Sequence, residues 1–276
     1  QTREHFMALQ SKKIKNIIVV QNKIDLISKE QAIENHKEIQ KFLKQCGYEN
    51  SPIIPISAQQ QINIDKILEE ICKVEIPERN TEDDPIFLVA RSFDINRPGK
   101  KIEKLNGGVL GGILKKGKLK KGDKIEIKPG ITVKEANQIV NKALETEILS
   151  LHKGQEEVEE VIPGASISIE TNLDPALTKT DALIGNVVAI KGKLPEISRS
   201  ITIKAELFKE IYGEQGHHPV EPIKTKEMLM LNINTTTTVG TVEKVDKKTG
   251  DIELSLNIPV IALPGDKLGI ARNHNG

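Results

Sequence analysis

The chain has few of the residues that mark stacking surfaces, disulfide frameworks and membrane spans. Tryptophan is absent and aromatic residues make up 3% of the 276 residues, which argues against a base-stacking nucleic-acid platform. Cys46 and Cys72 belong to no Cys-x-x-Cys or Cys/His spacing, so neither a zinc site nor a disulfide framework is indicated. No apolar stretch approaches about 18 residues and no charged-then-apolar leader is present, so we expect a cytosolic protein without a membrane span.

The chain also lacks a strong net charge. Charged residues make up 29% of it, yet the formal net charge is +1, so no global field draws it onto nucleic acid or membrane. A contact with RNA would need a local basic face. The one dense basic run consists of Lys115, Lys116, Lys118, Lys120 and Lys121. It could meet phosphates or protect a solvated strand edge, and the sequence leaves both open.

The stretch that says most about function is the apolar run Ile17–Val20, which is followed closely by Asn22-Lys23-Ile24-Asp25. Such a run predicts a buried parallel strand, and ligands of open α/β sheets lie beyond the carboxyl ends of these strands. Asn-Lys-x-Asp in this place is the guanine-reading motif of GTP-binding proteins. The Asp25 carboxylate can accept two parallel hydrogen bonds from the guanine ring N–H and amine, a donor pair that adenine lacks. Asn22 can offer its amide to the base or to a neighbouring loop, and the Lys23 methylenes can lie along the base.

A second motif supports this interpretation. Ile53–Ile56 is a short apolar run that ends in Ser57-Ala58-Gln59, which matches the Ser-Ala-x element that follows the next strand in the same proteins. A backbone N–H after Ser57 would then face the guanine carbonyl oxygen and reject the adenine amine. The alternative for the first motif is a solvated turn, and the second motif makes the nucleotide-binding interpretation the stronger one.

The order of expected elements divides the chain into several domains. Strand, helix, strand and helix over residues 1–76 predict the closing half of a parallel sheet packed by helices, and Ser28 with Gln31 forms a capping-box pattern that begins the first of these helices. The polar, Pro-containing residues 77–84 are the expected linker. Short runs separated by Gly, Pro and Asn then predict two antiparallel barrels, over residues 85–192 and 193–276.

Several other patterns resemble functional sites but lack a residue that such a site requires or have a simpler explanation. Gly112–Lys118 fits Gly-x4-Gly-Lys, but Leu119 replaces the required Ser or Thr. The His217-His218 pair has no third metal ligand in view, and the glutamates at 156–160 are better explained as a solvated surface. No Ser/His/Asp or Cys/His arrangement stands out. We therefore expect no catalytic nucleophile and no metal site.

Six segments together resemble a known family, the gamma subunit of archaeal and eukaryotic translation initiation factor 2, over nearly the whole chain. They are Gln1–His5, Gln21–Leu26, Pro52–Gln59, Arg91–Gly99, Gly107–Gly112 and Leu173–Pro175. The Arg91–Asp94 and double-glycine segments are not shared in this form with elongation factor Tu.

The resemblance implies an α/β plus all-β fold, namely the C-terminal half of a P-loop-type GTPase domain followed by two antiparallel β-barrels, the second incomplete. It also implies a cytosolic, GTP-dependent carrier of methionyl initiator tRNA that works with alpha and beta subunits on the small ribosomal subunit. The first barrel would contact the alpha subunit, and the GTPase domain the beta subunit. By the same resemblance Asn22, Lys23, Ile24, Asp25, Ser57, Ala58 and Gln59 bind the guanine of GTP or GDP.

The chain also departs from the family pattern. In the family the phosphate-binding loop, both switches and the Asp-x-x-Gly motif precede the position of Gln1, so this chain has none of the residues that would hold phosphates or Mg²⁺. It is therefore expected to be inactive as a GTPase, although the parent protein would be one. Pro163-Gly164-Ala165 replaces a proline followed by two glycines. Two alternatives stay open: a non-catalytic scaffold with a vestigial GTPase half, and a Tu-type or selenocysteine-specific elongation factor.

Overall fold

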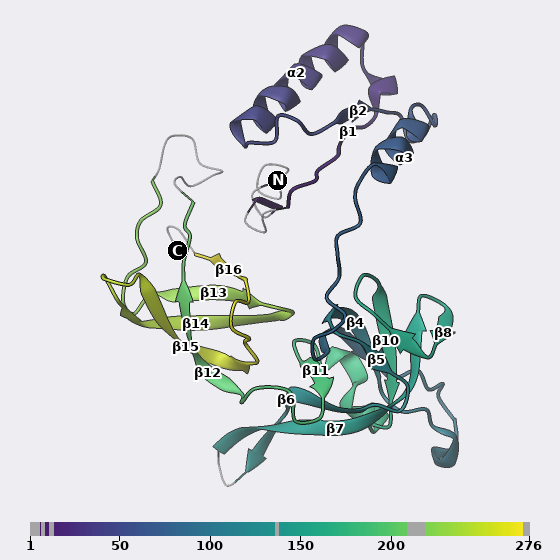
Figure 1. Cartoon of the computed structure of the whole chain (residues 1–276), viewed down its shortest axis with the longest axis vertical. Helices are drawn as coiled ribbons and strands as arrows, with labels where there is room; N and C mark the ends of the chain where they lie inside the picture. The colour runs from purple at the N-terminus through teal and green to yellow at the C-terminus, as the bar shows by residue number, and fades with distance from the viewer. Residues whose placement is uncertain (1–5, 7–8, 11–13, 136–137, 209–218, 273–276) are drawn as a thin grey trace. The chain divides into compact units, whose positions relative to one another are not determined.

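The computed structural model of the chain (Figure 1) describes residues 6, 9–10, 14–135, 138–208 and 219–272. The chain folds as two compact units, Gln1–Glu78 and Arg79–Gly276. The His217-His218 pair lies outside the described residues. In the part of the chain that is described, no helix is long and apolar enough to cross a bilayer.

The first unit is a small α/β arrangement. Its elements are β1 (Val19–Gln21), η1 (Ile24–Leu26), α2 (Lys29–Gln45), β2 (Ile53–Pro55) and α3 (Ile64–Cys72). β1 and β2 pair in parallel, which confirms the expected direction. Both halves of the capping box form at the start of α2, because the Ser28 side chain accepts from the Gln31 N–H and the Gln31 side chain accepts from the Ser28 N–H.

The prediction that the first strand is buried was wrong. β1 has three residues, and Val20 on it is 42% exposed. On α3, Leu68 and Ile71 are 58% and 53% exposed. The physical reason is that two strands and their helices, within the described residues, provide too few neighbours to cover both faces of the sheet. Apolar side chains of β1 and α3 are therefore exposed on the surface of the unit.

The second unit begins with a barrel-like antiparallel sheet. Its strand order is β10-β4-β3-β11-β6-β7-β8, and an additional β10–β7 pairing closes it. A separate two-stranded sheet pairs β5 with β9. The strands are β3 (Ile86–Phe93), β4 (Val109–Lys116), β5 (Leu119–Lys120), β6 (Lys124–Glu135), β7 (Gln138–Lys153), β8 (Glu156–Val158), β9 (Glu160–Val161), β10 (Ser166–Thr171) and β11 (Val187–Ile190). Three short 3-10 turns complete it: η2 (Ile102–Lys104), η3 (Pro175–Leu177) and η4 (Lys179–Asp181). Its core is made of fully buried side chains that include Phe87, Leu110, Ile127 and Ile169.

The remaining strands form a second antiparallel sheet in the order β12-β15-β14-β13-β16. They are β12 (Ser198–Lys204), β13 (Met228–Ile233), β14 (Thr236–Val245), β15 (Asp251–Val260) and β16 (Leu268–Ala271). Alternation decides which face is buried. On β13 the side chains of Leu229, Leu231 and Ile233 enter the core, whereas Met228 and Met230 are exposed.

The carboxylate of Asp181 fixes the turn that leads from η4 toward β11. Thr180 and Asp181 both adopt positive φ, 52° and 62°, a conformation that non-glycine residues hold only when neighbours enforce it. The backbone N–H of Ser92 donates to Asp181 Oδ1 at 2.9 Å, and Arg91 Nε donates to the same oxygen at 3.0 Å. These two donors lower the pKa of the Asp181 carboxyl, the Ser92 N–H having the larger effect.

Because the pKa of Asp181 is lowered in the folded state, its contribution to the free energy of unfolding depends on pH. Because the folded-state pKa lies below the unfolded value of about 3.9, the stabilisation is fully present above that value and is lost as pH falls through the folded pKa. Asp181→Asn is expected to unfold at lower urea concentration than the unsubstituted chain at pH 7. The two midpoints should converge as the pH is lowered through the folded-state pKa of Asp181, because both states then bind the proton. A gap in urea midpoint that stays constant over this range would contradict the assignment.

Candidate nucleotide-binding site

The two predicted guanine-reading motifs lie together at the carboxyl ends of β1 and β2. Asn22 Oδ1 accepts hydrogen bonds from the Ala58 N–H at 3.1 Å and from the Lys23 N–H at 2.8 Å. The Ile24 N–H donates to the Ile56 carbonyl at 3.2 Å. One amide side chain therefore ties the loop after β1 to the loop after β2, the second of the two roles expected for Asn22.

The backbone of the first motif is held in an unusual conformation. Lys23 has φ 66°, in the left-handed region, and η1 begins immediately after it. Such a conformation costs about 1–3 kcal/mol for a side-chain-bearing residue and is found where surrounding contacts enforce it, often at ligand sites. Asp25 lies in this 3-10 turn and is exposed, as is Lys23. An exposed carboxylate at this edge of the sheet is accessible to a base.

The second motif forms a loop closed on itself. Ser57 is 1% exposed, and its Oγ accepts from the Gln60 N–H at 3.1 Å. Ser57 and Ile62 exchange two backbone hydrogen bonds, 3.0 and 3.3 Å long. Ser57 therefore shapes the loop from inside, whereas Ala58 and Gln59 are exposed. Since the Ala58 N–H already donates to Asn22, the Gln59 N–H is the exposed loop amide that has no partner among the described residues.

Two residues that position these loops were missed in the sequence. The buried side chain of Gln21, the last residue of β1, donates from Nε2 to the Ala32 carbonyl at 2.9 Å and to Asn35 Oδ1 at 3.1 Å. These bonds fasten the end of β1 to α2. Asn63, at φ 58°, donates from Nδ2 to the Pro55 carbonyl at 2.8 Å and so fixes the start of α3. The only sequence feature that could have indicated this role of Gln21 is its position as a polar residue at the end of an apolar strand.

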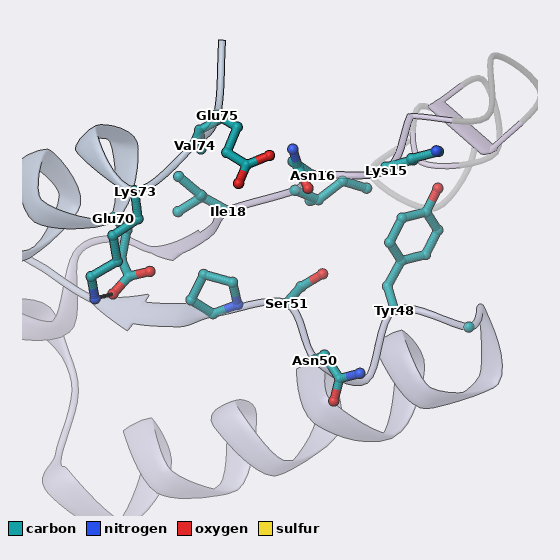
Figure 2. Close-up of a pocket in the computed structure, with 13 residues that line it drawn as sticks. Lys15, Asn16, Ile18, Tyr48, Asn50, Ser51, Glu70, Lys73, Val74 and Glu75 are labelled. Atoms are coloured by element: carbon teal, nitrogen blue, oxygen red, sulfur yellow. Dashed lines mark hydrogen bonds and ion pairs between the residues drawn. The ribbon is translucent and has the colours of Figure 1, made fainter. Parts of the chain in front are cut away.

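A cavity in the same unit lies at the opposite ends of the strands. It encloses about 500 Å³ and is lined by residues that precede β1 and β2 and by the end of α3. Figure 2 shows Lys15, Tyr48, Ser51 and Lys73 around it. Lys73 Nζ forms an ion pair with Glu70 at 2.6 Å, and this hydrogen bond raises the pKa of Lys73. Because both motifs follow the strands and this cavity precedes them, the cavity is separate from the candidate site.

The basic run in the second unit is not a free cationic surface. All five of its lysines form ion pairs with acidic side chains. The pairs are Lys115 with Asp266, Lys116 with Asp83, Lys118 with Glu82, Lys120 with Glu160, and Lys121 with Glu157. Glu157 and Glu160, which belong to the acidic stretch at 156–160, are thus ion-pair partners of these lysines. No group of three metal-binding side chains occurs in the described ranges, and Gly112–Lys118 spans the end of β4 and the turn after it.

Comparisons with known proteins agree with this arrangement. Residues 1–77 match the family model "Elongation factor Tu GTP binding domain", residues 107–193 match "Elongation factor Tu domain 2", and residues 199–276 match "Initiation factor eIF2 gamma, C terminal". Translation initiation factor 2 subunit gamma of Pyrococcus horikoshii is 48% identical over 273 residues, and that of Methanocaldococcus jannaschii is 47% identical over the same length. The chain belongs to this gamma-subunit family. It covers 66% of each relative's length, just under two thirds, while 99% of the chain is matched.

Solved structures of other translation factors share the fold of this chain. Bacterial selenocysteine-specific elongation factor EF-Sec matches with TM-score 0.76 and 22% identity, covering 98% of this chain and 40% of that one. Translation elongation factor SelB from Methanococcus maripaludis matches with TM-score 0.74 and 21% identity, covering 98% and 58%. At these identities the likeness shows the fold alone. A GTPase-type domain followed by barrel-like domains, as in elongation factor Tu, is thus the architecture of the chain.

Proposed function

We propose that the chain is part of a GTP-dependent initiation factor that delivers methionyl initiator tRNA to the small ribosomal subunit. The single observation that carries the proposal is the 48% identity to initiation factor 2 gamma over 99% of the chain. As in the resemblance, alpha and beta subunits would bind the first barrel and the GTPase domain, respectively. Domain limits at 1–76, 85–192 and 193–276, and a cytosolic location, belong to the same proposal.

Within this function the first unit would read the base of GTP or GDP. The Asp25 carboxylate would accept the guanine ring N–H and amine, and the Lys23 stem would lie on the base. Asn22 joins this turn to Ala58 at 3.1 Å, so both loops are held ready for one ligand. The Gln59 N–H, next to the occupied Ala58 N–H, is the free donor for the guanine carbonyl oxygen. Ile24 fixes the turn through Ile56.

The residues present fit the base but do not fit the phosphates or Mg²⁺. The chain contains no Gly-x4-Gly-Lys-Ser/Thr loop, and no cluster of possible metal ligands occurs among the described residues. Mg²⁺ would neutralise phosphate charge in the family's reaction, but nothing in this chain assigns residues to it. We therefore derive no hydrolytic step for these residues.

We expect this chain by itself to bind guanine nucleotides weakly and to leave GTP unhydrolysed. Contacts to the base without contacts to phosphates should give an affinity no better than about 0.1 mM. Isothermal titration with GDP and a phosphate-release assay with GTP measure the two quantities. Micromolar affinity, or phosphate release above the buffer rate, would contradict this expectation.

A chimaera tests the proposed function directly. The 273 matched residues of the Pyrococcus horikoshii gamma subunit are replaced by this chain, which restores whatever the relative carries beyond the match. The chimaera is expected to bind methionyl initiator tRNA in the presence of GTP and less well with GDP. A folded chimaera that binds GTP but not the tRNA would favour the scaffold alternative. Preference for selenocysteinyl-tRNA would favour the elongation-factor alternative.

A further inference from the structure

A second group of cations lies in the loop that joins β3 to β4. This loop, residues 94–107, contains two acids, Asp94 and Glu103, and the η2 turn lies within it. Its cations, all on exposed residues, are Arg97, Lys100, Lys101 and Lys104. Since the whole chain has a net charge of only +1, the loop is a local concentration of positive charge.

These cations differ from the lysines at 115–121, each of which is paired with an acid. Arg97, Lys101 and Lys104 form no ion pair or side-chain hydrogen bond with any described residue. A carboxylate beside a lysine cancels most of its field at a distance, whereas an unpaired cation keeps its field over about a Debye length. The loop therefore offers free cations to an anionic ligand, which the lysines at 115–121 do not.

The loop is held in shape by its own side chains. Asn96 Nδ2 donates to the Asn106 carbonyl and Asn96 Oδ1 accepts from the Asn106 N–H, both at 2.8 Å, which closes the base of the loop. Lys100 Nζ donates to Asn96 Oδ1 at 3.1 Å and to Asn106 Oδ1 at 2.9 Å. Both acceptors are neutral, so the charge of Lys100 is not cancelled. A loop fixed in this way presents its cations with little ordering cost on binding.

The 3-10 turn η4 adds a further cation beside this loop. Thr178 Oγ1 donates to the Phe93 carbonyl at 3.2 Å, which holds the start of η4 against the end of β3. Lys179 is exposed and has no acidic partner among the described residues. The pKa of Asp94 is lowered mainly by the Asn96 N–H and to a smaller extent by Lys179 and Lys100, so both ammonium groups lie near it. We name the following side chains the loop cations: Arg97, Lys100, Lys101, Lys104 and Lys179.

The composition of this surface fits a phosphate backbone better than a protein partner. The centres of protein interfaces are rich in aromatic residues and Met and poor in Lys, and residues 94–107 contain no aromatic residue and no Met. Ammonium and guanidinium groups donate charge-assisted hydrogen bonds to phosphate. Without aromatic rings the loop cannot stack on bases. Contacts with phosphates alone position a nucleic acid but do not read its sequence.

We propose that the loop cations bind the phosphate backbone of double-stranded RNA. The contact involves neither bases nor an aminoacyl group, so it is independent of RNA sequence and of the guanine nucleotide. It is therefore separate from the delivery of initiator tRNA, and either proposal can fail without the other. Ile102, which is 83% exposed on η2, is the feature that an acidic protein segment would use instead.

Binding of the intact chain to a fluorescent RNA duplex of about 20 base pairs, measured by anisotropy over a range of KCl concentrations, tests the proposal. In the loop variant Arg97→Gln, Lys101→Gln and Lys104→Gln are combined. It should bind the duplex at least about tenfold more weakly at low salt, and the slope of log affinity against log salt should fall by about two to three. Because these side chains make no bond in the fold, the circular dichroism spectrum and urea midpoint should not change.

The matched control combines Lys116→Gln, Lys118→Gln and Lys120→Gln, which removes the same net charge from lysines that are paired with acids. It should leave the affinity for the duplex within about twofold of the unsubstituted chain. The proposal is overturned if both triple variants lose the same affinity, if the loop variant keeps the original salt slope, or if the intact chain does not bind the duplex. Tighter binding to polyglutamate than to RNA, lost in the loop variant, would assign the surface to an acidic protein segment and also overturn it.

Discussion

Gly112→Ala is expected to lower the free energy of unfolding of the first barrel by about 3 kcal/mol or more. β4 lies between β3 and β10, so its backbone cannot move away from one neighbour without approaching the other. A Cβ at position 112 would stand 2.0 Å from the Leu88 carbonyl oxygen and 3.0 Å from Phe87 Cζ. The first of these atoms is backbone and the second belongs to a fully buried ring. Urea unfolding followed by circular dichroism measures the loss.

The neighbouring glycine provides a matched control on the same strand. A Cβ at Gly111 would meet Arg91 Cβ at 3.5 Å and Phe93 Cε1 at 3.6 Å, which are ordinary van der Waals distances. Gly111→Ala is therefore expected to change stability by no more than about 0.5 kcal/mol. If the two substitutions cost the same, the close approach of β3 to Gly112 is not the reason for the glycine there.

Asp25→Asn is expected to reverse base preference in the chimaera described above. The carboxylate accepts two hydrogen bonds from guanine, whereas an amide presents one acceptor and one donor. Xanthine carries a carbonyl where guanine has its amine, so it matches the amide. We expect about a hundredfold loss of GDP affinity and a gain for xanthosine diphosphate, both measured by competition with a fluorescent nucleotide.

The control for this prediction is Asp65→Asn, because Asp65 is an exposed acid on α3 whose nearest recorded cationic partner is Lys66 at 3.8 Å. It should leave both nucleotide affinities within about twofold of the unsubstituted chimaera. Retention of GDP preference by Asp25→Asn would show that the carboxylate does not contact the base edge.

Local patterns predicted the elements that depend on neighbours in sequence. The Ser28–Gln31 capping box spans three residues and formed as expected. The buried and exposed side chains of β13 alternate because a strand turns successive side chains to opposite faces, but no buried residue was predicted there. Asn22 was expected to reach a neighbouring loop, and it accepts a hydrogen bond from the Ala58 N–H. This expectation required only one long-range assumption, that β1 and β2 are parallel neighbours.

Features that depend on distant residues could not be predicted in this way. Lys115 pairs with Asp266, 151 residues away, so the sequence could not separate a free basic patch from a neutralised one. The hydrogen bond from Arg79 to the Pro163 carbonyl likewise joins residues far apart in the chain. Burial of β1 was overestimated because the run of β-branched residues indicates a strand but not how many neighbours cover it. Gln21 was missed because its partners lie on the following helix.

Chemical-shift titration of the labelled chain with GDP and, separately, ADP, each at millimolar concentration, tests guanine recognition most directly. The amides of Lys23, Asp25, Ala58 and Gln59 should shift with GDP and stay in place with ADP, because only guanine offers the donor pair that the Asp25 carboxylate accepts. Equal shifts with both nucleotides, or GDP-induced shifts confined to the cavity around Lys15 and Tyr48, would contradict the assignment of these residues to guanine.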